Sequence, residues 1–196
     1  MSRVLLRQWR DGDLEPYFAM NTDPEVMRFF PAPMTRQEAS DSLERLRAGI
    51  EERGWGVWAV ECDGAFAGMT GLSVARFAAP FTPCTEVLWR MRREFWGRGL
   101  AREAAAQALE FGFSRLGLAE IVAFTAAVNL RSIRLMERLG FARDGGGDFD
   151  HPALPPGHPL CRHVLYRKGR ERSAAAPPSG GGFSIRNGGV GISLKP

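Results

Sequence analysis

Apolar residues between positions 35 and 54 recur at helical spacing, at Ala39, Leu43, Leu46 and Ile50. This period predicts an amphipathic helix with one buried face. Thr35 and Glu38 stand at its start as a T-x-x-E capping box, in which each side chain bonds the backbone N–H of the other residue. Gly54 is expected to end the helix.

The following region has the pattern of β-strands. The runs 56–62 (GVWAVEC) and 65–72 (AFAGMTGL) are rich in strand-forming residues and are joined by Asp63-Gly64, a pair typical of a two-residue hairpin turn. After a loop with two prolines, TEVLWRM at 85–91 predicts another strand. These strands are close enough in sequence to pair with one another.

The second half of the chain alternates helices and strands. An alanine-rich helix follows residue 99, a buried strand is expected at 121–126 (IVAFTA), and 163–167 (HVLYR) is expected to close the sheet. A short helix near residues 129–141 has Asn129 as its expected cap. Its inward side chains are expected to be Leu130, Ile133, Met136 and Leu139. Strands that cluster first and then alternate with helices indicate a mixed α/β sheet and not a doubly wound parallel one.

Length and composition suit one globular domain with a tail. Residues 1–170 are expected to form the domain, and 171–196, rich in Gly, Ser and Pro, are expected to form a mobile C-terminal tail. The net charge of +4 comes from 26 basic residues that are scattered among acidic ones and form no basic tract. Nucleic acid is therefore not expected as a partner.

Cysteine usage and hydropathy bear on the compartment. Three cysteines without a CxxC pair argue against disulfides and against a zinc site. The sequence starts without an apolar signal core and has no apolar run long enough to span a bilayer. We expect a soluble cytoplasmic protein with no membrane partner.

Residues 94–113, EFWGRGLAREAAAQALEFGF, place two glycines and an arginine directly before a helix. Unpaired N–H groups at a helix start lie at the positive end of its dipole, and glycine lets the main chain approach a phosphate closely. Arg98 adds positive charge between Gly97 and Gly99. The pattern lacks the GxxxxGK[ST] of P-loops and the third glycine of GxGxxG. It predicts an anion site, with a simple strand-to-helix turn as the alternative.

The strand 85–91, the turn WGRGLA at 96–101 and the later AFTAAVNLRS at 123–132 together resemble the GNAT acyl-CoA-dependent N-acetyltransferases. The family motif is Q/R-x-x-G-x-G/A. Trp96 stands here at its first position, which resembles the branch containing the ribosomal-protein-alanine N-acetyltransferases. The resemblance covers about residues 3–168. It implies a mostly antiparallel central sheet flanked by helices, a V-shaped splay between two central strands, and acetyl-CoA as co-substrate without a metal.

The resemblance also implies roles for the motif residues. The CoA pyrophosphate would be held by the backbone amides of Gly97, Arg98, Gly99, Leu100 and Ala101. Trp89, Arg90 and Met91 would pair with the pantetheine amides, and a bulge near Arg90 would open the splay. Asn129 would contact the pantetheine, and Ser132 would lie near the thiol.

The expected chemistry is direct attack of a neutral amine on the thioester carbonyl in a ternary complex. Such an enzyme removes a proton from an ammonium and protonates a thiolate. Glu86 is the candidate base, directly or through water, and a solvated strand-end carboxylate is the alternative. Ser132 is the candidate acid or else a helix cap. Tyr166 is either a core aromatic with a bonded hydroxyl or a contact near the thiol or the acceptor.

Residues 148–160, DFDHPALPPGHPL, provide a candidate acceptor site. Asp148 or Asp150 would hold the cationic amine, and His151 would shuttle a proton. A rigid loop with Asx turns is one alternative, and a metal site is another, although no metal-ligand spacing is present. The floor of the acceptor cleft is expected to contain Phe29, Phe30 and Pro31.

The leading function is transfer of an acetyl group from acetyl-CoA to a primary amine, either a protein N-terminus or a small molecule. A non-catalytic acyl-CoA-binding module is the alternative, because it would keep WGRGLA and lack the proton-transfer groups. Homodimerisation is a further expectation, since dimers are common in families of this kind.

Overall fold

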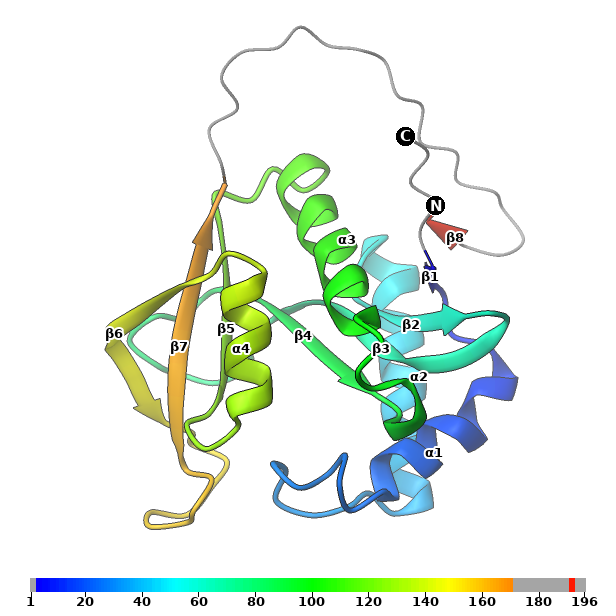
Figure 1. The fold of residues 1–196 in the computed structure, drawn as a ribbon, viewed down its shortest axis with the longest axis horizontal. Coiled ribbons are helices and arrows are strands. Elements are labelled where there is room, and N and C mark those ends of the chain that lie inside the picture. Colours follow the sequence, from blue (N-terminus) through cyan, green and yellow to red (C-terminus); the bar gives the residue numbers. More distant parts are fainter. Residues whose placement is uncertain (1–2, 171–190, 193–196) are drawn as a thin grey trace, which may run out of the picture.

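A sheet of eight strands runs through the protein, of which the computed structural model describes residues 3–170 and 191–192. The strands are β1 (Val4–Arg7), β2 (Val57–Cys62), β3 (Ala65–Val74), β4 (Thr85–Met91), β5 (Glu120–Ala126), β6 (Ala142–Asp150), β7 (Arg162–Gly169) and β8 (Gly191–Ile192). They lie in the order β6-β7-β5-β4-β3-β2-β1-β8 (Figure 1). Neighbouring strands are antiparallel except β4 and β5, which are parallel.

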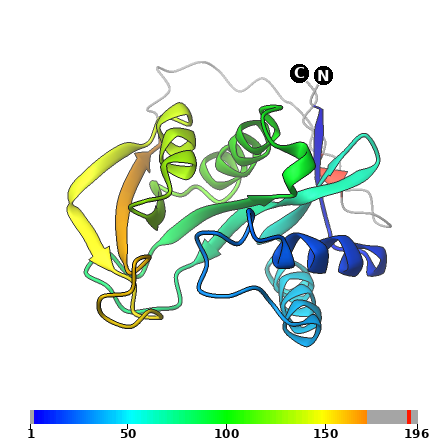
Figure 2. The ribbon, with the colours of Figure 1, turned by 60° about the horizontal axis from the view of Figure 1, so that its bottom comes forward.

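Helices cover both faces of the sheet, with α1 and α2 on one face and α3 and α4 on the other (Figure 2). Their bounds are α1 (Leu14–Thr22), α2 (Arg36–Arg53), α3 (Leu100–Ser114) and α4 (Leu130–Arg138). Two short 3-10 helices are η1 (Asp11–Asp13) and η2 (Arg93–Phe95). The expected mixed, mostly antiparallel sheet flanked by helices is confirmed.

Local signals in the sequence set two of these elements. At the start of α2, Glu38 accepts from the Thr35 N–H at 2.7 Å and donates its own N–H to the Thr35 hydroxyl at 3.2 Å, so the capping box is present. Asp63 and Gly64 turn between β2 and β3 with φ of 52° and 77°. Positive φ at both positions is what a type I′ hairpin turn requires.

The alanines of α3 explain how this helix sits on the sheet. Ala104, Ala105 and Ala108 have no exposed surface, and small side chains let a helix axis approach a sheet closely. Trp58 of β2 is fully buried, and its ring lies 5.2 Å from that of Phe111 on α3, edge to face. This packing holds α3 against the middle of the sheet.

The expected inward face of α4 is wrong at one position. Met136 and Leu139 are buried, but Leu130 is 57% exposed. Each residue turns a helix by about 100°, so the nine steps from Leu130 to Leu139 make about two and a half turns. The two side chains therefore lie on opposite sides of the axis. The buried stripe is centred on Met136 instead.

The predicted mobile tail, 171–196, lies outside the described residues except for Gly191–Ile192. These two residues pair antiparallel with Leu6 and Arg7 of β1. No helix within the described ranges is long and apolar enough to cross a bilayer.

Candidate active site

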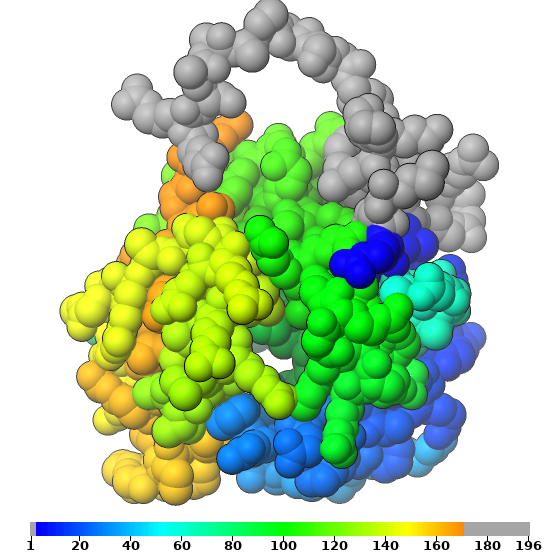
Figure 3. Space-filling view, viewed as in Figure 1, coloured from blue at the N-terminus to red at the C-terminus, as the bar shows by residue number. Residues whose placement is uncertain are grey.

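The strands β4 and β5 are joined by a single pair of opposed residues and then separate. Glu86 faces Val122 as the pair that joins them, whereas β4 pairs with β3 from Thr85 to Met91. The two strands therefore diverge toward their carboxyl ends, which gives the expected V-shaped splay (Figure 1). The molecular surface is hollowed between α4, in yellow-green, and the start of α3 with η2, in green (Figure 3).

The expected bulge near Arg90 is absent. The β3–β4 register continues through Arg90 opposite Met69 and Met91 opposite Gly68 without a shift. The splay has a different cause, because β4 follows β3 while β5 stays paired with β7 from Glu120 to Ala126. Each half of the sheet thus twists with its own partner strand.

The WGRGLA turn has the geometry of an anion site. Gly97 and Gly99 have φ of 74° and 77°, a region that favours glycine, and a Cβ at Gly97 would meet nothing within 4 Å. Glu103 donates its N–H to the Gly99 carbonyl at 3.2 Å, where the hydrogen bonding of α3 begins. The amides before it, at the N-terminus of α3, are available to a phosphate. Trp96 anchors the turn by donating its indole N–H to the Met91 carbonyl at 2.9 Å.

Three arginines surround this turn, of which the sequence singled out one. Arg98 reaches Asp63 at 3.3 Å and lies over the Phe95 ring. The guanidinium of Arg131 lies 4.5 Å from the Trp96 ring centroid, and Arg3 has a nitrogen 3.6 Å from the position of a Cβ on Gly99. Arg131 directly follows the first residue of α4, so it could have been suspected. Arg3 is distant in sequence and could not.

The strand β4 presents alternate backbone groups to the cleft. Arg92 donates its N–H to the Ala67 carbonyl at 2.9 Å. In an antiparallel ladder every second residue bonds the same neighbour, so the backbone of Arg90 is directed at β3. The backbone groups of Trp89 and Met91 are directed toward β5, across the opening. Of the three residues expected to pair with pantetheine, Trp89 and Met91 thus have backbone groups directed at the opening, and Arg90 does not.

The side chain of Arg90 lies instead on the face of the sheet covered by α1. Its Nη1 donates to the side-chain carbonyl of the buried Asn21. Its guanidinium carbon lies 3.8 Å from the Phe30 ring centroid, and its Nε is buried without a hydrogen-bond partner in the described part of the chain. Burial lowers the pKa of Arg90 to about 10. Phe30 therefore packs against Arg90, whereas Phe29 lies near the Arg28 guanidinium.

Glu86 lies on the same face of β4, four residues before Arg90, which is about 13 Å along a strand. The ion pairs of the described residues do not include Glu86. Burial raises its pKa to about 7 because the charged form loses hydration. A carboxyl group that titrates near neutral pH is suited to accept a proton from an ammonium.

Asn129 and Ser132 lie where β5 leads into α4. The Asn129 side chain caps the helix by accepting from the Ser132 N–H at 3.3 Å, and it donates to the Thr125 hydroxyl at 3.0 Å. The cap is thus Asn129, as expected. The Ser132 hydroxyl makes no hydrogen bond with the described residues and is half-buried. It is not occupied as a cap.

Tyr166 lies away from Glu86. On β7 it pairs with Ala123, whereas Arg167 pairs with Val122, the residue opposite Glu86, so Tyr166 lies on the other face of the sheet. Its side chain is 4% exposed, and its hydroxyl donates to Glu137 of α4 at 3.3 Å. Burial, followed by the nearby Glu137, raises its pKa. This placement matches a core aromatic with a bonded hydroxyl.

The expected acceptor wall does not converge. Asp148 accepts from Arg143 at 2.6 Å, Asp150 is exposed and 3.5 Å from Arg162, and His151 turns into an aromatic cluster. Groups of acidic, His and Cys side chains able to hold a metal are absent among the described residues. The two aspartates and the histidine therefore form no common site.

The aromatic cluster fills the face of the sheet beside β5. Its members are Phe77, Phe81, Phe124, Phe149, His151 and His163. The two histidine rings have centroids 4.9 Å apart, and burial lowers the pKa of both. His151 Nδ1 accepts the N–H of Ala153 at 3.2 Å. A neutral ring bonded in this way keeps a proton on Nε2, so His151 is placed as a donor and not as a base.

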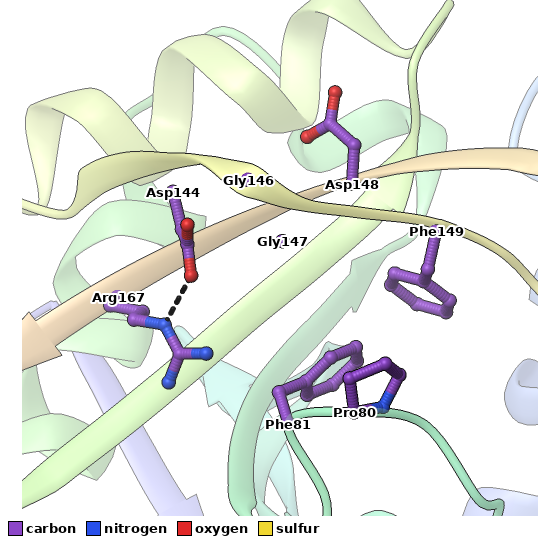
Figure 4. A pocket seen from close by; sticks show the side chains of 8 residues that line it. All are labelled: Pro80, Phe81, Asp144, Gly146, Gly147, Asp148, Phe149 and Arg167. Atoms are coloured by element: carbon purple, nitrogen blue, oxygen red, sulfur yellow. Dashed lines mark hydrogen bonds and ion pairs between the residues drawn. The ribbon is translucent and has the colours of Figure 1, made fainter.

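A shallow hollow of about 220 Å³ lies beside this cluster, between β6 and the β3–β4 loop (Figure 4). Arg167 crosses it and pairs with Asp144 at 2.6 Å and with Glu120 at 2.7 Å. Asp148 points away from Phe81 and Asp144 in this view. Each charged residue that lines the hollow is thus paired, Asp144 with Arg167 across it and Asp148 with Arg143 beside it.

Comparison with known proteins is consistent with this geometry. A solved GNAT-family acetyltransferase from Bacillus anthracis superposes with a TM-score of 0.70 over 86% of this chain and 96% of that chain, at 23% identity. The spermidine N(1)-acetyltransferase of Escherichia coli K12 is 29% identical over 151 residues, 72% of this chain and 74% of that enzyme.

A second relative is named for its acetyl donor. The FsC-acetyl coenzyme A-N(2)-transacetylase of Aspergillus fumigatus is 30% identical over 145 residues, which are 70% of this chain. They span 62% of that enzyme, less than two thirds of its length. Residues 3–142 match the family model described as acetyltransferase (GNAT) domain. The chain therefore belongs to the GNAT family of acetyltransferases.

Proposed function

We propose that this chain transfers an acetyl group from acetyl-CoA to a primary amine by direct attack within a ternary complex. The observation that carries the proposal is the single β4–β5 pair followed by a splay. It leaves an opening that is flanked by the glycine turn before α3 and by the start of α4. A thioester placed there would have main-chain donors on one side and two proton-transfer groups nearby.

The donor site is proposed from main-chain geometry. The amides from Gly97 to Ala101 would hold the pyrophosphate, with Arg98, Arg131 and Arg3 adding positive charge. The backbones of Trp89 and Met91 would bond the pantetheine arm along the edge of β4. Asn129, held by Thr125, would contact the arm from the other side.

Proton transfer is proposed for Glu86 and Ser132. Glu86, with a pKa of about 7, would take the ammonium proton, directly or through a water. The neutral amine attacks the thioester carbonyl, and the tetrahedral oxyanion then collapses with cleavage of the C–S bond. Ser132 would give its proton to the leaving thiolate and regain one from solvent. Tyr166, whose buried hydroxyl is already bonded to Glu137, is left out of the chemistry.

The names of the relatives point to more than one class of acceptor. One is named a spermidine acetyltransferase and another an N(2)-transacetylase. The protein N-terminus implied by the resemblance to the ribosomal-protein-alanine branch is a further candidate. Homodimerisation also stays a prediction.

A screen with acetyl-CoA tests the proposal. The full-length protein is mixed with polyamines, free amino acids, amino acid amides and short peptides, and thiol release is followed together with the product mass. Acetylated amine above the hydrolysis background is expected. Tight CoA binding without transfer to any amine would instead identify a non-catalytic acyl-CoA-binding module.

A further inference from the structure

We propose that the amine acceptor carries a carboxylate close to its amine, and that Arg90 binds this carboxylate. The inference rests on the proposed acetyl transfer and names the acceptor class of that same site. It follows from the contacts of one arginine and from the charges around it.

The guanidinium of Arg90 has one edge in use and one edge without a hydrogen-bond partner among the described residues. Nη1 donates to Asn21, whose own amide donates to the Tyr17 carbonyl at 2.7 Å, so this partner is fixed. Nε is buried and has no partner among residues 3–170, and no hydrogen bond from Nη2 to those residues is present. Nε and Nη2 form the adjacent pair of donors that a carboxylate accepts with both of its oxygens.

Phe30 sets the plane of this group. Its ring lies 3.8 Å from the guanidinium carbon, which is stacking distance. With Asn21 on one edge and Phe30 on one face, the guanidinium is held in one orientation before any ligand arrives. A preorganised fork of this kind favours planar anions over single-point acceptors.

The charge of Arg90 is unmatched among the residues that the structure describes. The described residues offer it no carboxylate partner, whereas Arg7, Arg167 and Arg143 each have one. A buried cation without a counter-ion is unfavourable, and a carboxylate supplied by a ligand removes that penalty. Arg90 therefore differs from the structural arginines of the fold.

The same surroundings do not suit a polycation. Glu86 is half protonated near neutral pH, Asp148 is held by Arg143, and Asp150 is paired with Arg162 at the surface. A polyamine would meet the positive charge of Arg90, which repels it. An amino acid would instead place its amine toward the splay and its carboxylate on Arg90.

Matched acceptors test the inference. Free amino acids, their amides and spermidine are each assayed with acetyl-CoA. The wild-type kcat/KM is expected to be at least about tenfold higher for the acid than for its amide, because the unpaired guanidinium rejects the amide. Equal rates on acid and amide, or a preference for spermidine, would overturn the inference while acetyl transfer itself stands.

Substitution locates the effect. Arg90→Leu should lower kcat/KM on free acids by about 30-fold or more and leave the amides within about threefold. Arg90→Lys should recover only part of the activity on acids, because lysine lacks the planar fork. Arg45→Leu, at an exposed position of α2, is the matched control and should change neither. An equal loss on acids and amides would contradict the assignment.

A binding measurement keeps the inference separate from the proposed function. Free amino acids are titrated calorimetrically into the protein–CoA complex, with CoA affinity and melting temperature as folding controls. Binding that is lost in Arg90→Leu supports the anion site even if no amine is acetylated, an outcome that would contradict only the proposed function. Binding that is unchanged in Arg90→Leu rejects the site.

Discussion

Glu86 and Val122 form the one pair that joins β4 to β5, and the sheet opens directly beyond them. The carboxyl group at this junction is buried enough to titrate near neutral pH. The same pair thus ends the closed part of the sheet and places a proton acceptor at the start of the opening.

Glu86→Gln should remove an alkaline-rising limb from the pH profile. In the wild type, kcat/KM should rise as pH passes through about 7, because the ionised carboxylate is the active base. The variant should lose most of its activity, and its kcat/KM should no longer rise near pH 7. The rise that comes from deprotonation of the amine substrate should remain in both proteins. Both pH profiles are therefore measured with the same acceptor, so that this rise is identical. A limb that persists unchanged in the variant would remove Glu86 from the mechanism.

The same substitution has an effect of known sign on stability. Because the folded-state pKa of Glu86 is raised, its unfavourable ionisation costs nothing below pH 4 and reaches its full size above about pH 7. Glu86→Gln should therefore be more stable than wild type at pH 8, by at most about 3 kcal/mol, and gain little at pH 4. Urea denaturation at the two pH values measures the difference.

Gly99→Val should weaken CoA binding by at least about tenfold, since the valine side chain would occupy the approach of the phosphates. Valine at a φ of 77° also strains the backbone by about 1–3 kcal/mol. Gly117→Val is the control, because Gly117 has a φ of 66° and open space around it away from the turn. CoA affinity by calorimetry should fall in the first variant and not in the second.

Ser132→Ala should lower kcat by roughly 100-fold with little change in the Kd for acetyl-CoA, as expected when a general acid is removed. Its melting temperature should not change, because Asn129 supplies the cap and the serine hydroxyl has no partner among the described residues. Rapid-quench measurement of acetyl transfer separates chemistry from product release. If Ser132→Ala turned over as fast as the wild type, solvent and not Ser132 would protonate the thiolate.

Tyr166→Phe should leave turnover intact and reduce stability by about 0.5–1.5 kcal/mol, the usual value of one hydrogen bond. The hydroxyl it removes is the one bonded to Glu137. Thermal unfolding and kcat/KM are measured together. A loss of turnover without a loss of stability would restore Tyr166 as a catalytic candidate.

Sequence reasoning succeeded where the information is local. The capping box of Thr35 and Glu38, the Asp63-Gly64 turn and the glycines of WGRGLA are each read within a few residues, because backbone conformation dictates them. The cap at Asn129 belongs to the same class. Together with the resemblance to the GNAT family, these signals were enough to predict the mixed sheet and the helices that flank it.

The acceptor side was not predictable because it depends on distant contacts. Arg90 meets Asn21 and Phe30 across about 60 to 70 residues of chain, and no pattern near Arg90 announces them. For the DFDHP segment the sequence predicted a shared site that the structure does not form. Its two aspartates stand two residues apart, yet each takes a different arginine: Asp148 pairs with Arg143 of its own strand, and Asp150 pairs with Arg162 of the neighbouring strand.

The glycine turn before α3 has a consequence for how this enzyme can change over time. Its proposed donor contacts are main-chain amides, which survive most side-chain substitutions, whereas the proposed acceptor site is built by side chains from α1, the following loop and β4. Selection can therefore exchange the acceptor by altering two or three side chains while the acetyl donor is retained. The part of the molecule that is most recognisable is for that reason the part that says least about what each descendant acetylates.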